Sequence, residues 1–551
     1  MSLLLDYLTP ESLGLDAEKF PSFRDIQLEA IEKACFSDKR FVGLCCPTGT
    51  GKELVGMGVS RYSAKRSVIL THTRSLQDQY LDSHSNFGLV DIRGKDNYHC
   101  LGLESGSCRD GAESNCGFQR GHGCSYEIQK ARAMAADTVI SNYAFWINVN
   151  DRGSGLGDVD MDLETGEITG GVEQLILDEG HEAGRALENY LGFRLYEKEI
   201  SRWIDPLTQG DDLGEWAAQA RLIEEDLKAE IRTLRMEVQH VKGQRSKIVK
   251  LLETLKHLRA LYDKIFRLAG STAEDWVCEK QEGTRWGRIW EFNVISPGRY
   301  AEKYIYCGVP KVIFMSATLR PRNILGVRRD DMDFFEWAPI FPPQRNLKYF
   351  YPAIKDGKPL RISRSSSDSD LKLWVAHNDS ILDQFLDRRC VVITTSYAYQ
   401  KFFMENSKHA SHMVGNTQDP DSDSAREVFE KFIVTPPPIV LCSPSFGTGW
   451  NFSKKRGELL LIPKLPLRPP PSASKLIAAR MERDRQWSNG ETMQDIAQWA
   501  GRLMREDQDR STVIISDGSW AWFAPRSAHL APRGFVQSVR RVNGIKPMEK
   551  L

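Results

Sequence analysis

The 551-residue sequence predicts an α/β protein with two lobes, each built on a parallel sheet. In residues 40–190, and again in 390–517, short apolar runs alternate with loops and helix-like stretches, which is typical of repeated βαβ units. Residues 224–266 have helical periodicity throughout, and Gly243 marks a turn between two long helices. The apolar positions in the second half of this stretch are three or four residues apart: Leu251, Leu255, Leu258, Tyr262 and Ile265.

The composition is ordinary for a globular protein, with 41% hydrophobic and 27% charged residues. Lys and Arg total 74, as do Asp and Glu, so any nucleic acid must be held by local basic surfaces and not by net charge. One candidate surface is the C-terminal stretch after residue 525, although a solvated basic tail explains it equally well. Its basic residues, which oppose only Glu549, are Arg526, Arg533, Arg540, Arg541, Lys546 and Lys550.

Four of the 11 cysteines stand eight residues apart, at Cys100, Cys108, Cys116 and Cys124. The intervening sequence is rich in glycine and poor in apolar residues, so the segment cannot bury a core of its own and needs a staple. No run of 18 apolar residues and no basic leader occurs, so we expect a cytoplasmic protein without a membrane anchor, where disulfides do not persist.

We therefore expect a metal to cross-link the cysteine segment. The spacing of the cysteines is compatible with two kinds of metal site. Structural zinc sites usually take cysteines in pairs two to four residues apart, whereas every gap here is seven residues. Four separated thiolates suit an iron–sulfur cluster. The flanking His99 and His122 keep zinc open.

The first lobe begins with a glycine-rich loop, FVGLCCPTGTGKE. Gly49 and Gly51 free its backbone to fold around phosphates, and Lys52 follows at the start of a helix. The loop departs from the usual P-loop at Cys46, in the first glycine or alanine position, and at Glu53, where Ser or Thr usually offers a hydroxyl to magnesium. A carboxylate can bind the metal, but it also raises the cost of binding a triphosphate.

A second half of this site is predicted in residues 172–181, VEQLILDEGH. Asp178, at the end of an apolar strand, can hold magnesium through water, and Glu179 can position or activate the attacking water. Acidic pairs after a strand also begin helices, because carboxylates favour a helix N-terminus. The P-loop upstream favours the catalytic interpretation.

Several motifs resemble those of superfamily 2 helicases. PTGTGKE, DEGH, SATL at 316–319 and QWAGRLMR at 498–505 resemble motifs I, II, III and VI. Within the superfamily the chain resembles the iron–sulfur branch typified by XPD and DinG, and DinG most closely. FRDIQ at 23–27 resembles the adenine-reading Q motif, and THTRSLQDQYL at 71–81 resembles motif Ia of DinG. VVITTSYAYQKFF at 391–403 and SPSFGTGWNF at 443–452 resemble motifs IV and V.

This resemblance implies an ATP site with Mg²⁺ between two RecA-like motor lobes. Arg502 and Arg505, three apart on one helix face, would reach the γ-phosphate as arginine fingers, with Gln498 one turn earlier. Motif V is weaker, because Thr448 and Asn451 stand where the family usually has an acidic pair. The implied catalytic residues are Lys52, Asp178, Glu179, Gln498, Arg502 and Arg505. The implied ATP and magnesium contacts are Arg24, Gln27, Pro47, Thr48, Gly49, Thr50, Gly51, Lys52, Glu53, Asp178 and Gly449.

The order of the motifs also bears on the cysteines. They lie between motifs Ia and II, where the family has its cluster insertion, so the resemblance implies a [4Fe–4S] cluster on Cys100, Cys108, Cys116 and Cys124. The helical stretch corresponds to the Arch domain, which in the family forms, with the cluster domain, a hole for single-stranded DNA. The expected domains are 1–98, 127–192 and 293–340 for lobe 1, 99–126 for the cluster domain, 193–292 for a helical Arch domain, and 341–551 for lobe 2 with its connector and basic tail. The connector, near 342–371, is expected to have little order.

The function implied is that of an ATP-dependent DNA helicase that moves 5′→3′ on single-stranded DNA and opens forked duplexes. Thr73 and Arg74 in motif Ia, and Ser396 and Tyr397 in motif IV, are the expected DNA contacts. We expect a monomer in the cytoplasm, associated with the nucleoid and targeted by protein partners. The alternative is a helicase-shaped DNA clamp or scaffold with weak or absent ATPase activity because of Glu53.

Overall fold

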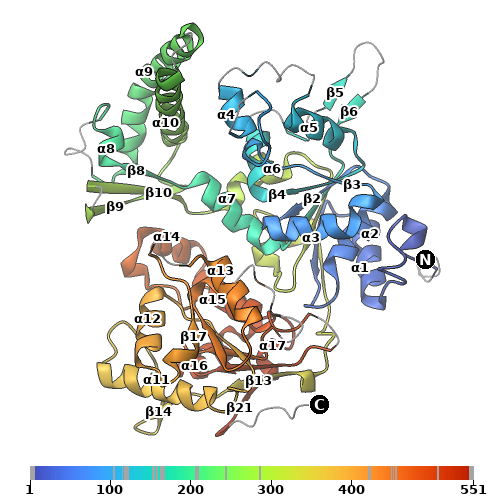
Figure 1. The fold of residues 1–551 in the computed structure, drawn as a ribbon, viewed down its shortest axis with the longest axis vertical. Helices are drawn as coiled ribbons and strands as arrows, with labels where there is room; N and C mark the ends of the chain where they lie inside the picture. Colours follow the sequence, from blue (N-terminus) through green and yellow to red (C-terminus); the bar gives the residue numbers. More distant parts are fainter. Residues whose placement is uncertain are drawn as a thin grey trace.

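The computed structural model describes residues 7–544 except for a set of short stretches. These stretches are 103–105, 114–115, 117–122, 152–154, 157–158, 162–167, 205–209, 242–244, 285–286, 420–422, 448–449, 451, 453–455 and 506–507. In the described chain, the two expected α/β lobes are confirmed as two separate seven-stranded sheets (Figure 1).

The first lobe is a parallel sheet in the order β12-β1-β11-β7-β2-β4-β3. All residues of β1, β2, β7 and β11 are buried, because helices cover both faces of this sheet. Its strands are β1 Phe41–Cys45, β2 Ser67–Thr71, β3 Leu89–Asp91, β4 Thr138–Asn142, β7 Gln174–Asp178, β11 Lys311–Met315 and β12 Met332–Glu336. Its helices are α1 Asp25–Phe36, α2 Lys52–Ser63, α3 Arg74–His84, α5 Ser125–Ala135, α6 Tyr143–Asp151 and α7 Ala183–Leu191.

Two insertions project from this lobe on the same side (Figure 1). The cysteine segment carries the short helix α4, Cys108–Glu113. The second insertion is a pair of long helices, α9 Leu213–His240 and α10 Arg245–Ala269, on a three-stranded antiparallel sheet. The expectation of an all-helical insertion was therefore incomplete, since β8 Phe193–Tyr196, α8 Glu197–Ile200, β9 Trp276–Thr284 and β10 Gly287–Val294 lie at its base. Gly243 lies outside the described residues.

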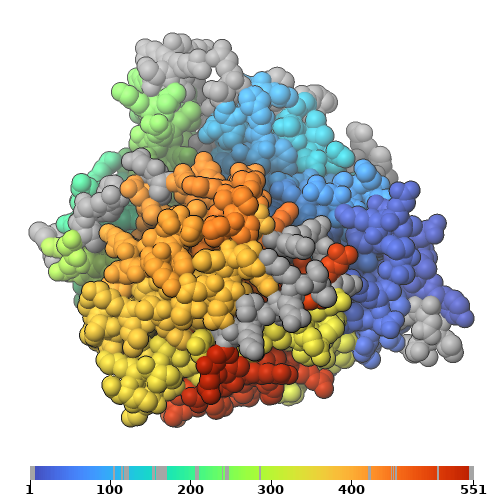
Figure 2. Space-filling view, turned by 60° about the horizontal axis from the view of Figure 1, so that its bottom comes forward, coloured from blue at the N-terminus to red at the C-terminus, as the bar shows by residue number. Residues whose placement is uncertain are grey.

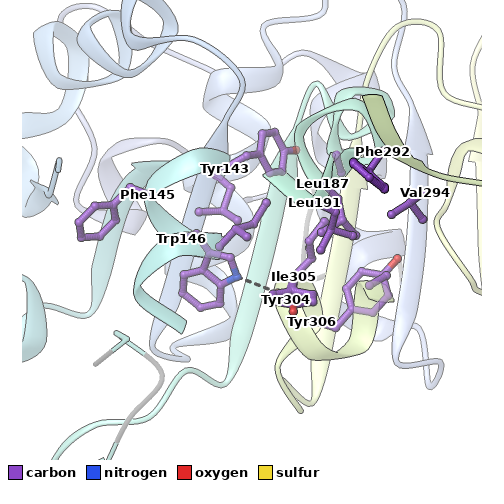
Figure 3. Close-up of a cluster of buried hydrophobic side chains, with 14 of the residues drawn as sticks. Tyr143, Phe145, Trp146, Leu187, Leu191, Phe292, Val294, Tyr304, Ile305 and Tyr306 are labelled. Carbon is purple, nitrogen blue, oxygen red and sulfur yellow. Dashed lines mark hydrogen bonds between the residues drawn. The ribbon is translucent and has the colours of Figure 1, made fainter. Parts of the chain in front are cut away.

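A shared hydrophobic core fastens the second insertion to the lobe. Tyr143 and Trp146 of α6 pack near Leu187 of α7 and near the one-turn helix Glu302–Tyr306 (Figure 3). The indole of Trp146 donates a hydrogen bond to the carbonyl of Ile305 at 2.8 Å. Phe292 and Val294 of β10 belong to the same cluster, so the insertion and the first lobe form one continuous core.

The second lobe is a parallel sheet in the order β17-β18-β16-β19-β20-β13-β21. Its strands are β13 Asn346–Phe350, β16 Arg389–Val392, β17 Met413–Val414, β18 Ile439–Cys442, β19 Leu459–Ile462, β20 Ser511–Ile515 and β21 Val539–Arg541. Its helices are α11 Asp368–Leu382, α12 Tyr397–Asn406, α13 Ala425–Val434, α14 Lys475–Arg483, α15 Trp487–Ala500, α16 Trp520–Ser527 and α17 Phe535–Ser538. A small hairpin, β14 Ile354–Lys355 and β15 Lys358–Pro359, follows β13.

One sequence-based expectation about this lobe was wrong. The connector near 342–371 was expected to have little order, but it contains β13, which lies in the sheet between β20 and β21. In the basic tail, Arg540 and Arg541 belong to the edge strand β21. Figure 2 shows this C-terminal segment in red, lying along the second lobe. Lys546, Glu549 and Lys550 lie outside the described residues.

Helix α14 of the second lobe is tied both to α7 of the first lobe and to the second insertion. Arg480 forms an ion pair with Glu188 at 3.0 Å and donates to the carbonyl of Val294 at 2.9 Å. The backbone N–H of Lys475 donates to Glu279 on β9 at 2.6 Å. Among the described helices, none is both long and apolar enough to cross a bilayer.

Candidate functional site

The glycine-rich loop joins β1 to α2 at the carboxyl edge of the first sheet. Gly49 and Gly51 have φ angles of +85° and +74°, which L side chains rarely adopt. The amide of Gln27 donates to the carbonyl of Thr50 at 2.8 Å, and the guanidinium of Arg24 donates to the carbonyl of Gly49 at 2.6 Å. Both residues of the expected Q motif therefore brace the backbone of the loop.

The two acids of the DEGH motif follow β7 directly. The side chain of Asp178 is buried, and it accepts hydrogen bonds from the hydroxyl of Tyr80 at 3.0 Å and from the backbone N–H of Glu179 at 2.9 Å. Burial and the neighbouring charge of Glu179 raise the pKa of Asp178 to about 6. A bound divalent cation would offset this repulsion, because it adds opposite charge beside both carboxylates.

Glu179 faces the phosphate loop from a strained backbone position with φ of +47°. Its Oε1 lies 3.9 Å from Nζ of Lys52. Burial alone would raise the pKa of Glu179, but the charges of Lys52, His181 and the two motif VI arginines outweigh it and lower this pKa to about 2. Glu179 is thus an ionised carboxylate beside the P-loop lysine.

A chain of polar contacts runs from Glu179 to the second lobe. The hydroxyl of Ser316 donates to Oε2 of Glu179 at 3.0 Å, and Nδ1 of His181 lies 2.6 Å from that hydroxyl. On the other side of the ring, Nε2 of His181 lies 3.1 Å from the amide nitrogen of Gln498. The same Nε2 atom also lies 3.2 Å from Oε1 of Glu182. Neither His181 nor Ser316 was singled out from the sequence, although both lie in the quoted DEGH and SATL motifs.

The motif VI arginines lie in the turn after α15 and not, as expected, on one helix face, because α15 ends at Ala500. Nε of Arg502 donates a hydrogen bond to the carbonyl of Gly447 at 3.2 Å. Burial and the nearby charge of Arg505 lower the pKa of Arg502 to about 10. The Nε atom of Arg505 is buried without a hydrogen-bond partner among the described residues, as are Oε1 of Gln498 and Oγ1 of Thr318. Buried unpaired polar atoms facing one cleft indicate a missing polar ligand.

The two lobes touch at the P-loop. A Cβ atom added to Gly501 would lie 2.9 Å from Oγ1 of Thr48, and one added to Gly49 would lie 3.2 Å from the carbonyl of Arg505. Motif VI therefore sits directly on the loop.

Next to this contact lies a cavity of about 620 Å³. Its lining includes one carboxylate, Glu179, and six cationic side chains, and this imbalance favours a polyanion. The cations are Lys52, Lys348, Arg502, Arg505, Arg533 and Arg540. Arg533 and Arg540 are thus cleft residues, which their position in a predicted basic tail did not reveal.

Glu53, the unusual P-loop residue, contacts α3. Its Oε2 accepts a hydrogen bond from the amide of Gln79 at 2.7 Å, and its Oε1 lies 3.2 Å from Nε2 of His84. Burial alone would raise the pKa of Glu53, but contacts with His84, Ser83 and Gln79 outweigh it and lower the pKa. The carboxylate is therefore held on the α3 side of the loop.

A second cavity, of about 560 Å³, lies between the first lobe, the cysteine segment and α10. Basic and aromatic side chains line it from all three: His72, Arg74, Lys95, Arg109, Tyr126, Phe145 and Arg259. Of the two motif Ia residues, Arg74 lines this cavity. Thr73 instead caps α3, since its hydroxyl accepts from the N–H of Leu76 at 3.2 Å.

The motif IV residues lie in the second lobe. Ser396 caps α12 by accepting from the N–H of Tyr399 at 3.3 Å. The hydroxyl of Tyr397 is 2.7 Å from that of Ser445 and accepts from the amide of Asn416. Gly449, Thr448 and Asn451 lie outside the described residues.

The four cysteines converge as two pairs. The Sγ atoms of Cys100 and Cys116 are 3.7 Å apart, and those of Cys108 and Cys124 are 3.5 Å apart. Burial and the adjacent Cys124 thiol raise the pKa of Cys108 to about 12. Within the described residues, no group of three or more His, Cys, Asp or Glu side chains is arranged to hold a metal ion.

The donor set nevertheless suits a thiophilic metal group, because one short segment holds its four thiols in two close pairs. Gly111 supports this close approach, since a Cβ atom there would lie 2.2 Å from Sγ of Cys100. His122 lies outside the described residues.

Comparisons with known proteins agree with this architecture. Residues 382–527 match the helicase C-terminal domain family. Over 138 residues the chain is 30% identical to the ATP-dependent DNA helicase YoaA of Haemophilus influenzae, in an alignment that covers 23% of this chain and 21% of that protein. The chain thus matches only about a fifth of the length of this curated relative.

Solved structures match almost the whole chain. An XPD helicase superposes with a TM-score of 0.63 at 15% identity, covering 94% of this chain and 99% of the XPD chain. Xpd4 of S. tokodaii superposes with a TM-score of 0.57 at 13% identity, covering 94% of this chain and 100% of Xpd4. With a helicase C-terminal domain in its second lobe and this architecture throughout, the chain has the fold of the XPD/DinG-like helicases of superfamily 2.

Proposed function

We propose that this protein is an ATP-dependent DNA helicase that moves along single-stranded DNA and opens duplexes. The observation that carries the proposal is the polar chain from Glu179 through Ser316 and His181 to Gln498. This chain joins Glu179, the candidate catalytic carboxylate of the first lobe, to the second lobe. The state of the bound nucleotide can therefore set the positions of the two lobes.

The chemistry at the cleft is phosphoryl transfer from ATP to water. Lys52 would bind the β- and γ-phosphates, and Glu179, ionised and 3.9 Å from Lys52, would orient the attacking water. Arg505, with its unpaired Nε, would neutralise charge on the γ-phosphate. Asp178 would hold Mg²⁺, which neutralises charge on the phosphate oxygens when bound. Arg502, bound to the carbonyl of Gly447, would link this step to the motif V segment.

The second cavity is the proposed passage for a single strand. Arg74, Lys95, Arg109 and Arg259 offer cations for phosphates, and Tyr126 and Phe145 offer rings on which bases can stack. On the second lobe, the motif IV segment at Ser396 and Tyr397 would contact the same strand. The 5′→3′ direction, the preference for forks, action as a monomer near the nucleoid and the domain boundaries stay predictions from the resemblance.

Cys100, Cys108, Cys116 and Cys124 would hold a [4Fe–4S] cluster. Its role would be structural, because a cluster joins both thiol pairs and so fixes the segment that forms one wall of the second cavity.

The alternative proposal is a helicase-shaped clamp on DNA with little ATPase activity, since Glu53 replaces the usual hydroxyl. Glu53 contacts Gln79 and His84, so its charge is already engaged on the side of α3. This geometry reduces the repulsion between the Glu53 carboxylate and a bound triphosphate, which is the reason for considering the clamp.

Steady-state ATP hydrolysis with and without single-stranded DNA separates the two proposals. A helicase shows hydrolysis that DNA stimulates and that Lys52→Ala abolishes. Activity no greater than that of Lys52→Ala, in protein that binds DNA, would establish the clamp. Glu53→Thr then reports whether the carboxylate is responsible, because only in that case does the substitution restore hydrolysis.

A further inference from the structure

Helix α3 runs from the second cavity to the phosphate loop. At its first residue, Arg74 lines the cavity proposed for the single strand. Further along the helix, Tyr80 donates to Asp178, and Gln79 and His84 contact Glu53. One rigid helix of 11 residues therefore touches the strand site, the magnesium carboxylate and the phosphate loop.

The contact with the phosphate loop depends on the unusual residue at position 53. Oε2 of Glu53 accepts a hydrogen bond from the Gln79 amide at 2.7 Å, and Oε1 lies 3.2 Å from Nε2 of His84, too far off line for a hydrogen bond in this structure. A Ser or Thr side chain ends at its γ atoms, so the usual residue of a P-loop could not span to both partners. The substitution thus adds a connection that an ordinary P-loop lacks.

The partners of Glu53 are themselves held in place. His84 is fully buried and stacks on the ring of Phe20, with centroids 5.4 Å apart. The hydroxyl of Ser83 accepts a hydrogen bond from Nζ of Lys19 at 2.6 Å. Because the far end of α3 is fixed by these contacts, Glu53 cannot shift without moving the helix or breaking the contacts.

We propose that Glu53, Gln79 and His84 form a bridge that couples nucleotide binding at the phosphate loop to single-stranded DNA binding at the start of α3. Gln79 is a positioning residue in this bridge, since it touches neither proposed ligand. By linkage, each ligand then strengthens the binding of the other by the same factor. The inference rests on the proposed function, because it assumes that both ligands bind.

The test measures the affinity for a fluorescent oligothymidine by anisotropy, with and without a non-hydrolysable ATP analogue and Mg²⁺. For the parent protein we expect the analogue to tighten binding about tenfold, within the usual range of coupling energies. Gln79→Leu should reduce this factor to about twofold or less, while the affinity for each ligand alone stays within about twofold of the parent. Asp82→Asn, an exposed change on the same helix, is the matched control and should keep the full factor.

A reciprocal exchange distinguishes the bridge from a general loss of packing. Gln79→Glu alone places two carboxylates together and should also abolish the coupling. Combining it with Glu53→Gln restores one amide and one carboxylate in exchanged positions, so the coupling should return. The bridge would be overturned if the double variant showed no coupling between the two ligands. It would also be overturned if Gln79→Leu kept the full increase in DNA affinity caused by the analogue.

The outcome for the parent protein separates this inference from the proposed function. Failure to bind either the oligothymidine or the analogue defeats the proposed function, and with it the assumption of the bridge. Independent binding of both ligands, with no change in affinity, leaves the helicase proposal standing and refutes the bridge alone.

Discussion

The interlobe cleft and the cysteine segment both gather reactive side chains, but they do so by different physical means. In the cleft, Asp178 ends β7, Ser316 directly follows β11, and Lys52 begins α2 after the loop from β1. These three strands are neighbours and fully buried, so the sheet positions the side chains without a ligand. In the cysteine segment the described regular structure is one six-residue helix, and two thiol pairs face each other. The cleft is thus preorganised by the fold, whereas the cysteine segment would depend on the metal group proposed for it.

The largest expected effect tests the preorganised cleft. Arg505→Ala removes the cation whose Nε is buried and unpaired, and we expect the DNA-stimulated kcat to fall about 10³-fold with a much smaller change in KM. Steady-state kinetics check this result. Arg526→Ala, which removes a cation stacked on Trp522 outside the cleft, is the control and should leave kcat unchanged. Equal losses in both variants would show that the effect is not specific to the cleft.

The second prediction tests the ligand-dependent segment. Cys108→Ser should remove bound iron, the brown colour and absorbance near about 400 nm, together with unwinding, while ATP hydrolysis stays within about threefold. Anaerobic purification, iron analysis and a forked-duplex assay measure these properties. Cys35→Ser, which changes a thiol outside the segment, should change none of them. Colourless parent protein with one zinc per chain would assign the four thiols to zinc instead.

A smaller effect is expected at the contact between the lobes. Gly501→Ala places a Cβ atom 2.9 Å from Oγ1 of Thr48, so motif VI must move back from the phosphate loop. We expect the ATPase rate to fall about tenfold, or about 1.4 kcal/mol, without a loss of melting temperature. In Gly270→Ala the nearest atom is 3.8 Å away, so this control should behave like the parent. An unchanged rate in Gly501→Ala would show that the lobes need not touch there.

The smallest effect concerns a partly buried cation in the cleft. Partial burial lowers the pKa of Lys348 to about 8, and its amine donates a hydrogen bond to the carbonyl of Asn346 at 3.4 Å. Below pH 8 Lys348 is charged in both the folded and the unfolded protein. The folded protein therefore bears the full free-energy cost of burying this charge. Between pH 8 and the unfolded value of about 10.4 the unfolded chain binds more protons, so stability rises with pH.

Lys348→Met should therefore be more stable than the parent by about 1 kcal/mol at pH 7.5, and less so at pH 9.5. Urea denaturation at several pH values measures the difference. Lys401→Met changes an exposed lysine and should give no pH-dependent difference. A gain for Lys348→Met that is the same at every pH would indicate improved apolar packing in place of relief of a buried charge.

Local sequence was sufficient to predict the parts of the site that are contiguous. The P-loop and the DEGH acids each follow one apolar strand, and a strand followed by a glycine-rich loop or acids has a local signature. Sequence could not reveal the link from Ser316 through His181 to Gln498, because it joins residues far apart in the chain. The position of Glu53 likewise depends on contacts with α3, which residue type alone does not specify.

The fold was predicted at the level of two lobes, and the misses have a common cause. The strands β13 and β21 contain Lys348, Arg540 and Arg541, and their polar character resembles that of a loop. They become strands through pairing with each other and with β20, a long-range effect. The sheet β8-β10-β9 was hidden for a similar reason, since two long helices separate β8 from its partners.

The attachment of α14 to the second insertion has a mechanical consequence. Arg480 joins this helix to Glu188 and to the carbonyl of Val294, and Lys475 joins it to Glu279. A swing of the second lobe away from the first must either carry the insertion along or break these polar contacts. Because the insertion shares a core with the first lobe, these contacts limit how far the second lobe can move from the first.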